Sequence, residues 1–508
     1  MKKIGLAITV VLAVAAQATA YPGSQYVWDN GAGDYSWDNP VNWSSDTKPG
    51  ANDEAAFTGV GTLRNVAATH IKLNANQTIY DLYAKQTTDS LYILGTGGYS
   101  LTLIGGDITS LKGRMNLQCP IYLGDNLAVW QHLNTNYPIQ MSTNSSINET
   151  VANTSIQLSG PNQSWDSTSQ GVDFGGRPIN ITGNLDIRSG NAYSMQTAGA
   201  VTYGIILGDN TGTLNAAVAG YGSSNDTMWA NITVRPGSTG TKTIGLVNRN
   251  TGAGVTWKGN VTLNDSLTVS NVLGTHATLI QRQIFTGVIS GDAGVTKAGT
   301  GVTWFNGQNT YKGTTTVSAG TLVIDNVTSG QGDFVVSSAA TLAGFGTIGL
   351  ADTKKVEVND GGTLSPGDMG TTKPVTSAVG TLTIDGDLLL HSLANLAFDI
   401  GESTTPGVTY DTIVLLSDLT LDGTLVVTPL ITFDNAPRTY TLIDYGSGTL
   451  TDIGLDVTGI PGGIPYSVVT GDGKVQLITG VIPEPATLLL LGTGALGLLG
   501  YLRRRRMS

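Results

Sequence analysis

The sequence predicts an all-β protein, a right-handed parallel β-helix (β-solenoid) in which short strands stack coil upon coil. Three observations support this prediction: a composition poor in helix formers, apolar residues at alternate positions, and related units that recur at the spacing of a solenoid coil. Glycine accounts for 68 of the 508 residues, and only 12% of the residues are charged. Glycine and β-branched residues disfavour helices and suit short strands joined by tight turns.

The alternation of apolar residues is clearest in three six-residue segments, 320–325, 380–385 and 423–428. Each begins Gly-Thr-Leu and continues with aliphatic residues at every second position. Because successive side chains of a strand point to opposite faces, this pattern predicts strands with one buried face.

The Gly-Thr-Leu units recur along the C-terminal half of the chain. Their starting positions differ by similar steps, except for one step about twice as long, from 380 to 423, which we interpret as two coils. A repeat of roughly 20 residues cannot bury its own apolar face, so it must stack on its neighbours. A set of β-sandwich domains remains the alternative, because sandwiches also show regular strand and turn signals. The units begin at Gly320, Ala340, Gly362, Gly380, Gly423 and Gly448.

The stretch at 287–322 carries a more specific pattern. It contains a Lys-x-Gly-x-Gly turn at 297–301, an Asn-Thr-Tyr-x-Gly turn at 309–313 and a Gly-Thr-Leu strand at 320–322. This combination resembles the autotransporter-associated β-strand repeat, in which these parts form about one and a half coils. The sequence departs from the usual pattern at 302–305, where Val-Thr-Trp-Phe is bulkier than the expected Thr-Leu pair.

The N-terminal end has the form of a secretory signal peptide. Lys2 and Lys3 precede an apolar run at 4–16, and small residues follow at Ala18 and Ala20. We expect cleavage after Ala20, with the Sec translocon and signal peptidase as partners. A permanent N-terminal anchor is the alternative, although the run is short for a membrane span.

The C-terminal end combines Pro483, Glu484 and Pro485 with an apolar segment at 486–502 and a cluster of four arginines. The segment is long enough to span a bilayer, with the basic cluster retained on the cytoplasmic side. The three parts resemble the PEP-CTERM sorting signal. This resemblance implies a transient inner-membrane insertion, processing by an exosortase-type enzyme, and a final location at the cell surface or outside the cell. A plain membrane anchor is the alternative. The basic cluster is Arg503, Arg504, Arg505 and Arg506.

The mature N-terminal region is rich in tryptophan. Trp28, Trp37 and Trp43 have two interpretations, a cap that closes the open end of the solenoid core or a platform on which a sugar ring stacks. The chain then divides into a signal peptide (1–20), a Trp-rich cap region (21–60), a β-rich solenoid with weak repeats (61–280), a solenoid with the autotransporter-associated type of repeat (281–480) and the sorting signal (481–508).

The sequence contains no recognisable catalytic or metal-binding constellation, and we assign no catalytic residue, metal or cofactor. The single cysteine, Cys119, excludes an intramolecular disulfide and is expected to be a buried structural thiol. The four histidines are far apart in sequence. Two pairs of acids at strand-like spacing are interpreted as turn residues rather than as a glycosidase pair. The pairs are Asp385 with Asp387 and Asp418 with Asp422.

Processing at both ends leaves a strongly acidic chain. The signal peptide and the apolar tail with its arginines contain no acid, so 20 basic and 37 acidic residues remain and the net charge is about −17. Such a surface repels phosphate, which argues against nucleic acid and against an anionic membrane as partners.

The leading hypothesis is a noncatalytic, adhesin-like structural protein of the cell surface, outer membrane or biofilm matrix, with surface polysaccharide as a candidate partner. A polysaccharide-active β-helix enzyme (a lyase or glycosidase) and a carbohydrate-binding module that uses the N-terminal tryptophans are the alternatives.

Overall fold

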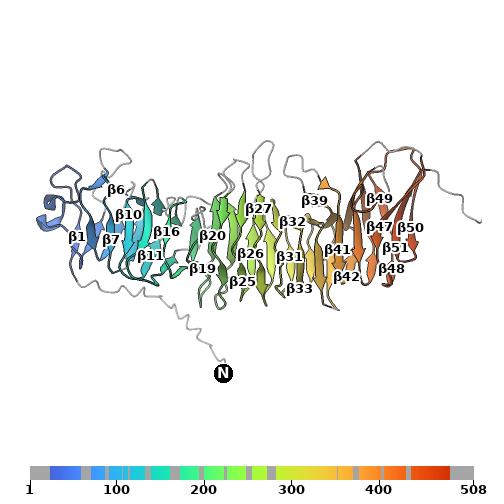
Figure 1. Cartoon of the computed structure of the whole chain (residues 1–508), viewed down its shortest axis with the longest axis horizontal. Helices are drawn as coiled ribbons and strands as arrows, with labels where there is room; N and C mark the ends of the chain where they lie inside the picture. The colour runs from blue at the N-terminus through green and yellow to red at the C-terminus, as the bar shows by residue number, and fades with distance from the viewer. Residues whose placement is uncertain are drawn as a thin grey trace, which may run out of the picture.

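The computed structural model shows a single elongated rod of stacked β-coils (Figure 1). Nearly all strand pairs are parallel, which confirms the all-β, parallel-sheet prediction and excludes the sandwich alternative; the right-handed sense of the coil stays a prediction. The structure describes residues 23–480 except 59–69, 86–90, 106, 113–114, 132–138, 143, 161–171, 175, 194–199, 222–225, 248–253, 272–281, 352, 370–376, 402–404 and 431–435.

Each complete coil contributes one strand to each of three faces. Face 1 is a single 16-stranded sheet that runs almost the whole length of the rod. At about 4.8 Å between neighbouring strands, this sheet is about 70 Å long. Its strands are β3 (Ile71–Leu73), β6 (Leu91–Gly95), β9 (Met115–Gln118), β12 (Ile139–Met141), β15 (Val172–Asp173), β18 (Gly190–Tyr193), β20 (Ala216–Tyr221), β23 (Lys242–Val247), β26 (Leu267–Ser270), β29 (Val295–Ala298), β31 (Thr315–Val317), β34 (Phe334–Val336), β37 (Lys355–Val358), β42 (Asp387–Leu390), β45 (Leu419–Leu421) and β48 (Leu450–Asp452).

Face 2 follows face 1 along the chain in each coil and consists of two sheets in succession. The first sheet contains β4 (Gln77–Ile79), β7 (Leu101–Leu103), β10 (Pro120–Leu123), β13 (Ser146–Glu149) and β16 (Ile179–Asn180). The second contains β21 (Asp226–Met228), β24 (Val255–Trp257), β27 (Arg282–Phe285), β30 (Val302–Phe305), β32 (Gly320–Ile324), β35 (Ala340–Gly344), β38 (Thr363–Pro366), β43 (Asn395–Ile400), β46 (Thr424–Pro429) and β49 (Asp456–Thr458).

Face 3 completes the coil and also consists of two sheets. The first contains β1 (Gln25–Val27), β2 (Glu54–Phe57), β5 (Asp81–Lys85), β8 (Asp107–Lys112), β11 (Leu127–Gln131), β14 (Ile156–Ser159), β17 (Asn184–Ile187), β19 (Gly204–Leu207), β22 (Ile232–Val234), β25 (Val261–Leu263) and β28 (Ile289–Gly291). The second contains β33 (Val327–Gln331), β36 (Thr347–Leu350), β41 (Thr381–Asp385), β44 (Thr412–Leu415), β47 (Arg438–Asp444), β51 (Lys474–Thr479) and β50 (Tyr466–Gly471).

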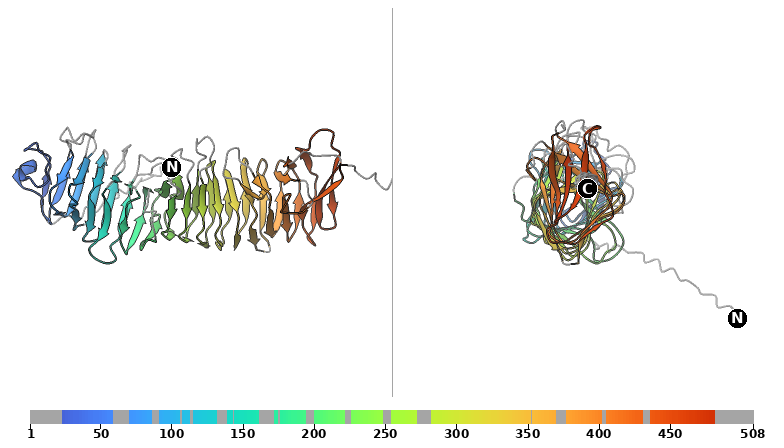
Figure 2. Two further views of the ribbon diagram at one scale, coloured as in Figure 1. Left: turned by 45° about the horizontal axis from the view of Figure 1, so that its top comes forward. Right: turned by 90° about the vertical axis from the view of Figure 1, so that its right-hand side faces the viewer.

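Three short elements lie outside this scheme. The 3-10 helices η1 (Pro40–Asn42) and η2 (Ser44–Asp46) belong to the N-terminal cap. The hairpin of β39 (Asp368–Met369) and β40 (Ser377–Ala378) is antiparallel, as is the final hairpin of β50 and β51 on β47. The left-hand view of Figure 2 shows the strands stacked along the rod, and the right-hand view looks along the rod axis.

The coil length is not constant, which corrects part of the repeat interpretation. On face 1, β29, β31, β34 and β37 begin at positions 295, 315, 334 and 355, so each of these coils has the predicted length of roughly 20 residues. The next three strands, β42, β45 and β48, begin at positions 387, 419 and 450, so these coils are about one and a half times as long. The longer coils carry loops between the strands of faces 2 and 3.

The interpretation of the long step from Gly380 to Gly423 as two coils is wrong. The units at Gly320, Ala340 and Gly423 lie on face 2, but the unit at Gly380 leads into β41 on face 3. On face 2 the coil between β38 and β46 is β43, which has no Gly-Thr-Leu unit. A Gly-Thr-Leu unit indicates only that a strand begins directly after a tight turn. Such turns precede strands on more than one face of the solenoid.

The inward-facing residues of all three faces form one core that extends from Trp28 to Leu477. The strands alternate buried and partly exposed residues, as in β37, where Val356 and Val358 point inward. Cys119 is buried in this core, as expected, and burial raises the pKa of its thiol to about 12.

A close backbone approach between coils makes glycine necessary at Gly330. A side-chain Cβ at this position of β33 would overlap the carbonyl oxygen of Tyr311 in the preceding coil. We expect Gly330→Ala to destabilise the protein by about 1–3 kcal/mol, because the coils must move apart. Gly462→Ala is the matched control, since a Cβ there meets no atom within 4 Å. Chemical denaturation measures both variants, and equal stability of the two would contradict this packing constraint.

Candidate functional site

The N-terminal tryptophans form a cluster inside the end of the solenoid. Trp28, Trp37 and Trp43 have exposed fractions of 2%, 0% and 0%. The ring centroids of Trp37 and Trp43 lie 4.8 Å apart, those of Trp28 and Trp43 5.1 Å apart, and Phe57 packs against all three. No indole face is therefore available to a sugar ring, which removes the basis of the glycan-stacking interpretation.

The same region also covers the hydrogen-bonding edge of face 1. The backbone N–H of Trp37 donates to Lys72 O of β3, and the N–H of Lys72 donates to Tyr35 O, both at 2.9 Å. The indole N–H of Trp43 donates to Trp37 O at 2.9 Å. An unpaired edge strand invites association with other strands, so this cap satisfies the first coil and blocks further stacking.

Three carboxylates stack on successive coils of face 3, just behind the cap. Glu54, Asp81 and Asp107 lie at the start of β2, β5 and β8, which pair in that order. Asp81 is 5% exposed, and its Oδ1 accepts a hydrogen bond from the N–H of Asp107 at 3.1 Å. Burial raises the pKa of Asp81 to about 7, and the charges of Asp107 and Glu54 add to the rise. Burial and Glu54 also raise the pKa of Asp107.

Lys297 is the lysine of the Lys-x-Gly-x-Gly turn, and its side chain is completely buried. Its ammonium group donates to the carbonyl oxygens of Ala298, Gly299 and Ala319 at 2.9, 2.8 and 3.1 Å. Burial lowers the pKa of this lysine to about 7. The lysine thus connects the turn after β29 with Ala319, which directly precedes β32 in the next coil. The lysine of the repeat motif therefore has a structural role here.

Three of the four acids considered from the sequence, Asp387, Asp418 and Asp422, hold turns in place. Asp387 accepts hydrogen bonds from the hydroxyl of Ser417 and the N–H of Asp418. Asp418 in turn accepts from the N–H of Thr449 at 2.7 Å, and Asp422 accepts from the N–H of Gly423 at 2.8 Å. Most of these bonds connect successive coils, and all of them match the turn interpretation.

Within the described residues, no three metal-ligating side chains gather into a possible metal site. Glu357 and His391 are close, with His391 Nε2 at 2.9 Å from Glu357 Oε1, and Lys355 also pairs with this glutamate. His70 stacks on Tyr92 at 4.4 Å, while His132 and His276 lie outside the described residues. The two described histidines therefore join neighbouring coils.

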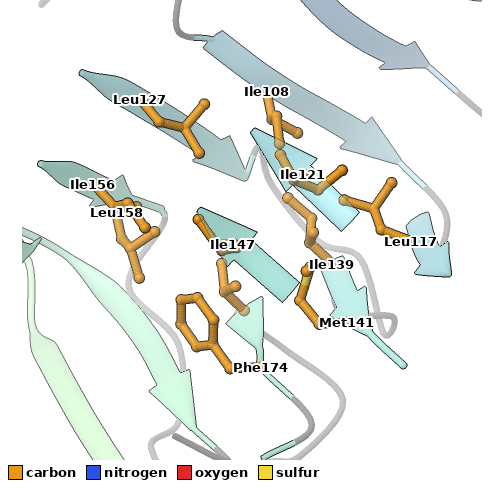
Figure 3. A pocket seen from close by; sticks show the side chains of 11 residues that line it. Ile108, Leu117, Ile121, Leu127, Ile139, Met141, Ile147, Ile156, Leu158 and Phe174 are labelled. Atoms are coloured by element: carbon orange, nitrogen blue, oxygen red, sulfur yellow. The ribbon is translucent and has the colours of Figure 1, made fainter. Parts of the chain in front are cut away.

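An apolar cavity of about 20 Å³ lies inside the solenoid (Figure 3). Side chains from several strands point into it, among them Ile121, Met141, Ile147 and Phe174. A water molecule needs a comparable volume and two or more polar partners, and this lining offers none. We interpret the cavity as a packing defect of the core rather than as a ligand site.

The signal-peptide residues Ala18 and Ala20, the sorting residues Pro483, Glu484 and Pro485, and the four C-terminal arginines lie outside the described residues. Between residues 23 and 480, the described segments contain no helix long and apolar enough to cross a membrane. The sorting and cleavage assignments thus stay predictions from sequence.

Comparison with known proteins supports both family resemblances. The family model for the PEP-CTERM protein-sorting motif matches residues 481–506, and that for the passenger-associated-transport-repeat matches residues 295–324. The resemblances to the PEP-CTERM sorting signal and to the autotransporter-associated repeat are therefore confirmed.

Among whole proteins, the chain is 36% identical over 169 residues to the adhesin BmaC autotransporter of Brucella suis biovar 1 (strain 1330). The match covers 33% of this chain but only 5% of the Brucella protein. The crystal structure of the Haemophilus influenzae Hap adhesin aligns with 84% of this chain and 49% of its own, at 12% identity and a TM-score of 0.25. A score this low does not establish a common fold.

The tryptophan cluster predicts a large effect of Trp43→Ala at the N-terminal end. Loss of a buried tryptophan costs about 3–5 kcal/mol, and the first coils have no preceding coil to compensate. Limited proteolysis should show faster cleavage within residues 23–85. Trp229→Ala is the control, because Trp229 is 36% exposed and stacks only under Lys258 in the described contacts. Unchanged protease resistance of Trp43→Ala would exclude the capping role.

The carboxylate stack predicts a pH-dependent stability of the first coils. The pKa of Asp81 is raised on folding, so the folded state binds the proton more tightly and stability falls as pH rises from about 4 through about 7. Asp81→Asn should keep the bond from the Asp107 N–H and stabilise β5 and β8 at pH 8 by on the order of 1 kcal/mol. Hydrogen exchange at these strands measures the effect, with the exposed Asp472→Asn as control. Equal slopes with pH in both variants would contradict this assignment.

Proposed function

We propose that this chain is an exported, noncatalytic, adhesin-like structural protein that reaches the cell surface or extracellular matrix through its C-terminal sorting signal. The observation that carries the proposal is the match of residues 481–506 to the PEP-CTERM protein-sorting motif, directly after the last strand of the solenoid. The order of the parts is that of a secreted body followed by a removable membrane segment.

The body between the two signals suits a structural role. One continuous core supports the rod, whose face 1 is about 70 Å long. Face 1 also continues across the expected boundary between the two solenoid regions near residue 280, because β26 pairs with β29. A rod of this kind presents a long side surface on which many weak contacts add together. The partial match to a Brucella adhesin supports an adhesin-like role in particular.

The distribution of polar groups agrees with a noncatalytic body. In the described residues the buried Lys297, Asp81 and Asp411 contact the backbone or other carboxylates of their own and neighbouring coils. Asp411 has a pKa raised to about 7 by burial, but both its oxygens accept backbone N–H bonds, from Gly380 and Asp399. These contacts lie inside the coils rather than in an open groove.

The proposal includes three processing steps. The Sec translocon and signal peptidase act on residues 1–20, the segment 486–502 inserts transiently into the inner membrane, and an exosortase-type enzyme recognises Pro483, Glu484 and Pro485. Arg503 to Arg506 keep the end of the segment in the cytoplasm by the positive-inside rule. Surface polysaccharide is the partner we propose for the released or attached rod.

Replacement of Pro483, Glu484 and Pro485 by alanine tests the sorting step in a deletion strain complemented with each form. We expect the variant to accumulate uncleaved in the inner-membrane fraction and to fail to restore surface attachment, because the processing enzyme no longer recognises it. Asp472→Asn, an exposed acid near the same end, should behave like the wild type. Normal processing of the alanine variant would exclude the sorting role, and normal attachment by the deletion strain would exclude the adhesin-like role.

A further inference from the structure

The C-terminal end of the rod has two corners of opposite character. We call the corner between faces 2 and 3 in the last three coils the exit corner, because the described chain ends there at Gly480. It is formed by the loops at 405–411, 428–430, 436–438 and 459–466. We call the corner between faces 3 and 1 in the same coils the acidic corner.

Contacts between the loops place them together at the exit corner. Leu430 N–H donates to Ile400 O of the preceding coil at 2.9 Å, and Gly459 packs against Val427. Gly480 N–H donates to Pro465 O at 2.9 Å, and Gly480 also lies against Ala436 and Pro437. The last described residue, Gly480, thus lies between the loops at 436–438 and 459–466 of this corner.

The exit corner exposes large apolar side chains. Val408 is 67% exposed, Leu430 50% and Tyr466 42%, and the loop at 459–465 reads Gly-Ile-Pro-Gly-Gly-Ile-Pro. Ile460 and Ile464 in that loop are half-buried. These exposed apolar side chains are suited to contact with an apolar partner.

The exit corner also lacks exposed acid in its described residues, although the mature chain is strongly acidic. Asp399 and Asp411 are 7% and 0% exposed, and Arg438 is the charged residue with partial exposure there. Glu402 and Asp434 lie outside the described residues. The acidic corner, by contrast, carries exposed or half-buried carboxylates at Asp385, Asp387, Asp418, Asp444 and Asp472.

The distance along the chain limits what the exit corner can face. Only residues 481–485 separate Gly480 from the apolar segment at 486–502. The six Cα–Cα steps from Gly480 to Ala486 reach about 22 Å at most when the chain is fully extended. If the segment spans the inner membrane, as the proposed function requires, the exit corner must lie within that distance of the bilayer surface.

We propose that the exit corner rests on the lipid bilayer while the sorting segment is still inserted, with its exposed apolar side chains in the headgroup region and the acidic corner turned to solvent. Tyrosine is well suited to a membrane interface, because its ring is apolar and its hydroxyl is polar. Among the described residues of this corner, no exposed carboxylate is placed to repel lipid phosphate. The contact holds the sorting residues at a set height for the processing enzyme.

A pair of introduced tryptophans tests the orientation in the full, uncleaved chain in vesicles of lipids with brominated acyl chains. Val408→Trp places an indole at the exit corner, and Leu416→Trp places one at the acidic corner of the same coil, where the exposed fraction is similar at 61%. The eight native tryptophans all precede residue 305, and the parent chain supplies their signal for subtraction. We expect bromine to quench the emission of the first variant and to leave that of the second unchanged.

Flotation of the same vesicles separates this inference from the proposed function on which it rests. If the chain floats with the lipid but both indoles are quenched equally, or neither is, the orientation is wrong while membrane insertion stands. Such a result would favour a processing enzyme or a second copy of the chain as the partner of the exit corner. If the chain does not float, the insertion step fails and the inference falls with it.

A second measurement asks whether the apolar side chains themselves make the contact. With Tyr466→Trp as the probe, the added substitutions Val408→Asp and Leu430→Asp should reduce quenching, because carboxylates leave the headgroup region. Both positions are exposed, so the fold tolerates the change. Leu416→Asp with the same probe is the matched control. Unreduced quenching with the paired substitutions would show that the short tether alone sets the position, and would overturn a docking role for these side chains.

Discussion

The hydrogen-bonded contact between one coil and the next determines the rest of this structure. A single coil has a strand on each face but no partner for its backbone groups and no second layer for its inward side chains. Both needs are met only by the coils before and after it. The short coils around β31 and the long coils around β45 therefore stack equally well, provided that their strands keep the register of the neighbours. Additional length is accommodated in loops at the corners.

The need for each coil to pair with its neighbours explains the features at the two ends of the solenoid and the stacking of carboxylates between coils. At the N-terminal end, residues 35–37 pair with the edge of β3 while three indoles fill the open core. At the C-terminal end, the antiparallel β50–β51 hairpin stops the parallel addition of coils on face 3. Within the rod, parallel pairing places side chains of successive coils directly above one another. Glu54, Asp81 and Asp107 are stacked in this way as three buried or half-buried carboxylates. A favourable stacking geometry thus imposes an electrostatic cost at this row.

The two ends of the rod consequently have different surfaces. The tryptophan cap is compact and has its aromatic rings inside, whereas the exit corner leaves apolar side chains exposed beside the point where the described chain ends. This difference is consistent with a molecule whose first coils are free in the exported compartment and whose last coils pass a stage next to a membrane. In the proposed processing, the sorting signal and the C-terminal end of the solenoid act together.

The sequence by itself determined the fold class, because alternation of apolar residues and units too short to fold alone have few solutions other than stacked coils. It also indicated the signals at both ends, since each is a contiguous stretch whose pattern does not depend on distant residues. Sequence did not determine which face each Gly-Thr-Leu unit joins, because the same turn precedes strands on different faces and only pairing with neighbouring coils decides between them. Nor did it determine that the tryptophans are buried, that carboxylates from three successive coils stack, or that an apolar corner surrounds Gly480. Each of these depends on residues that are distant in the chain and adjacent only once the coils have stacked.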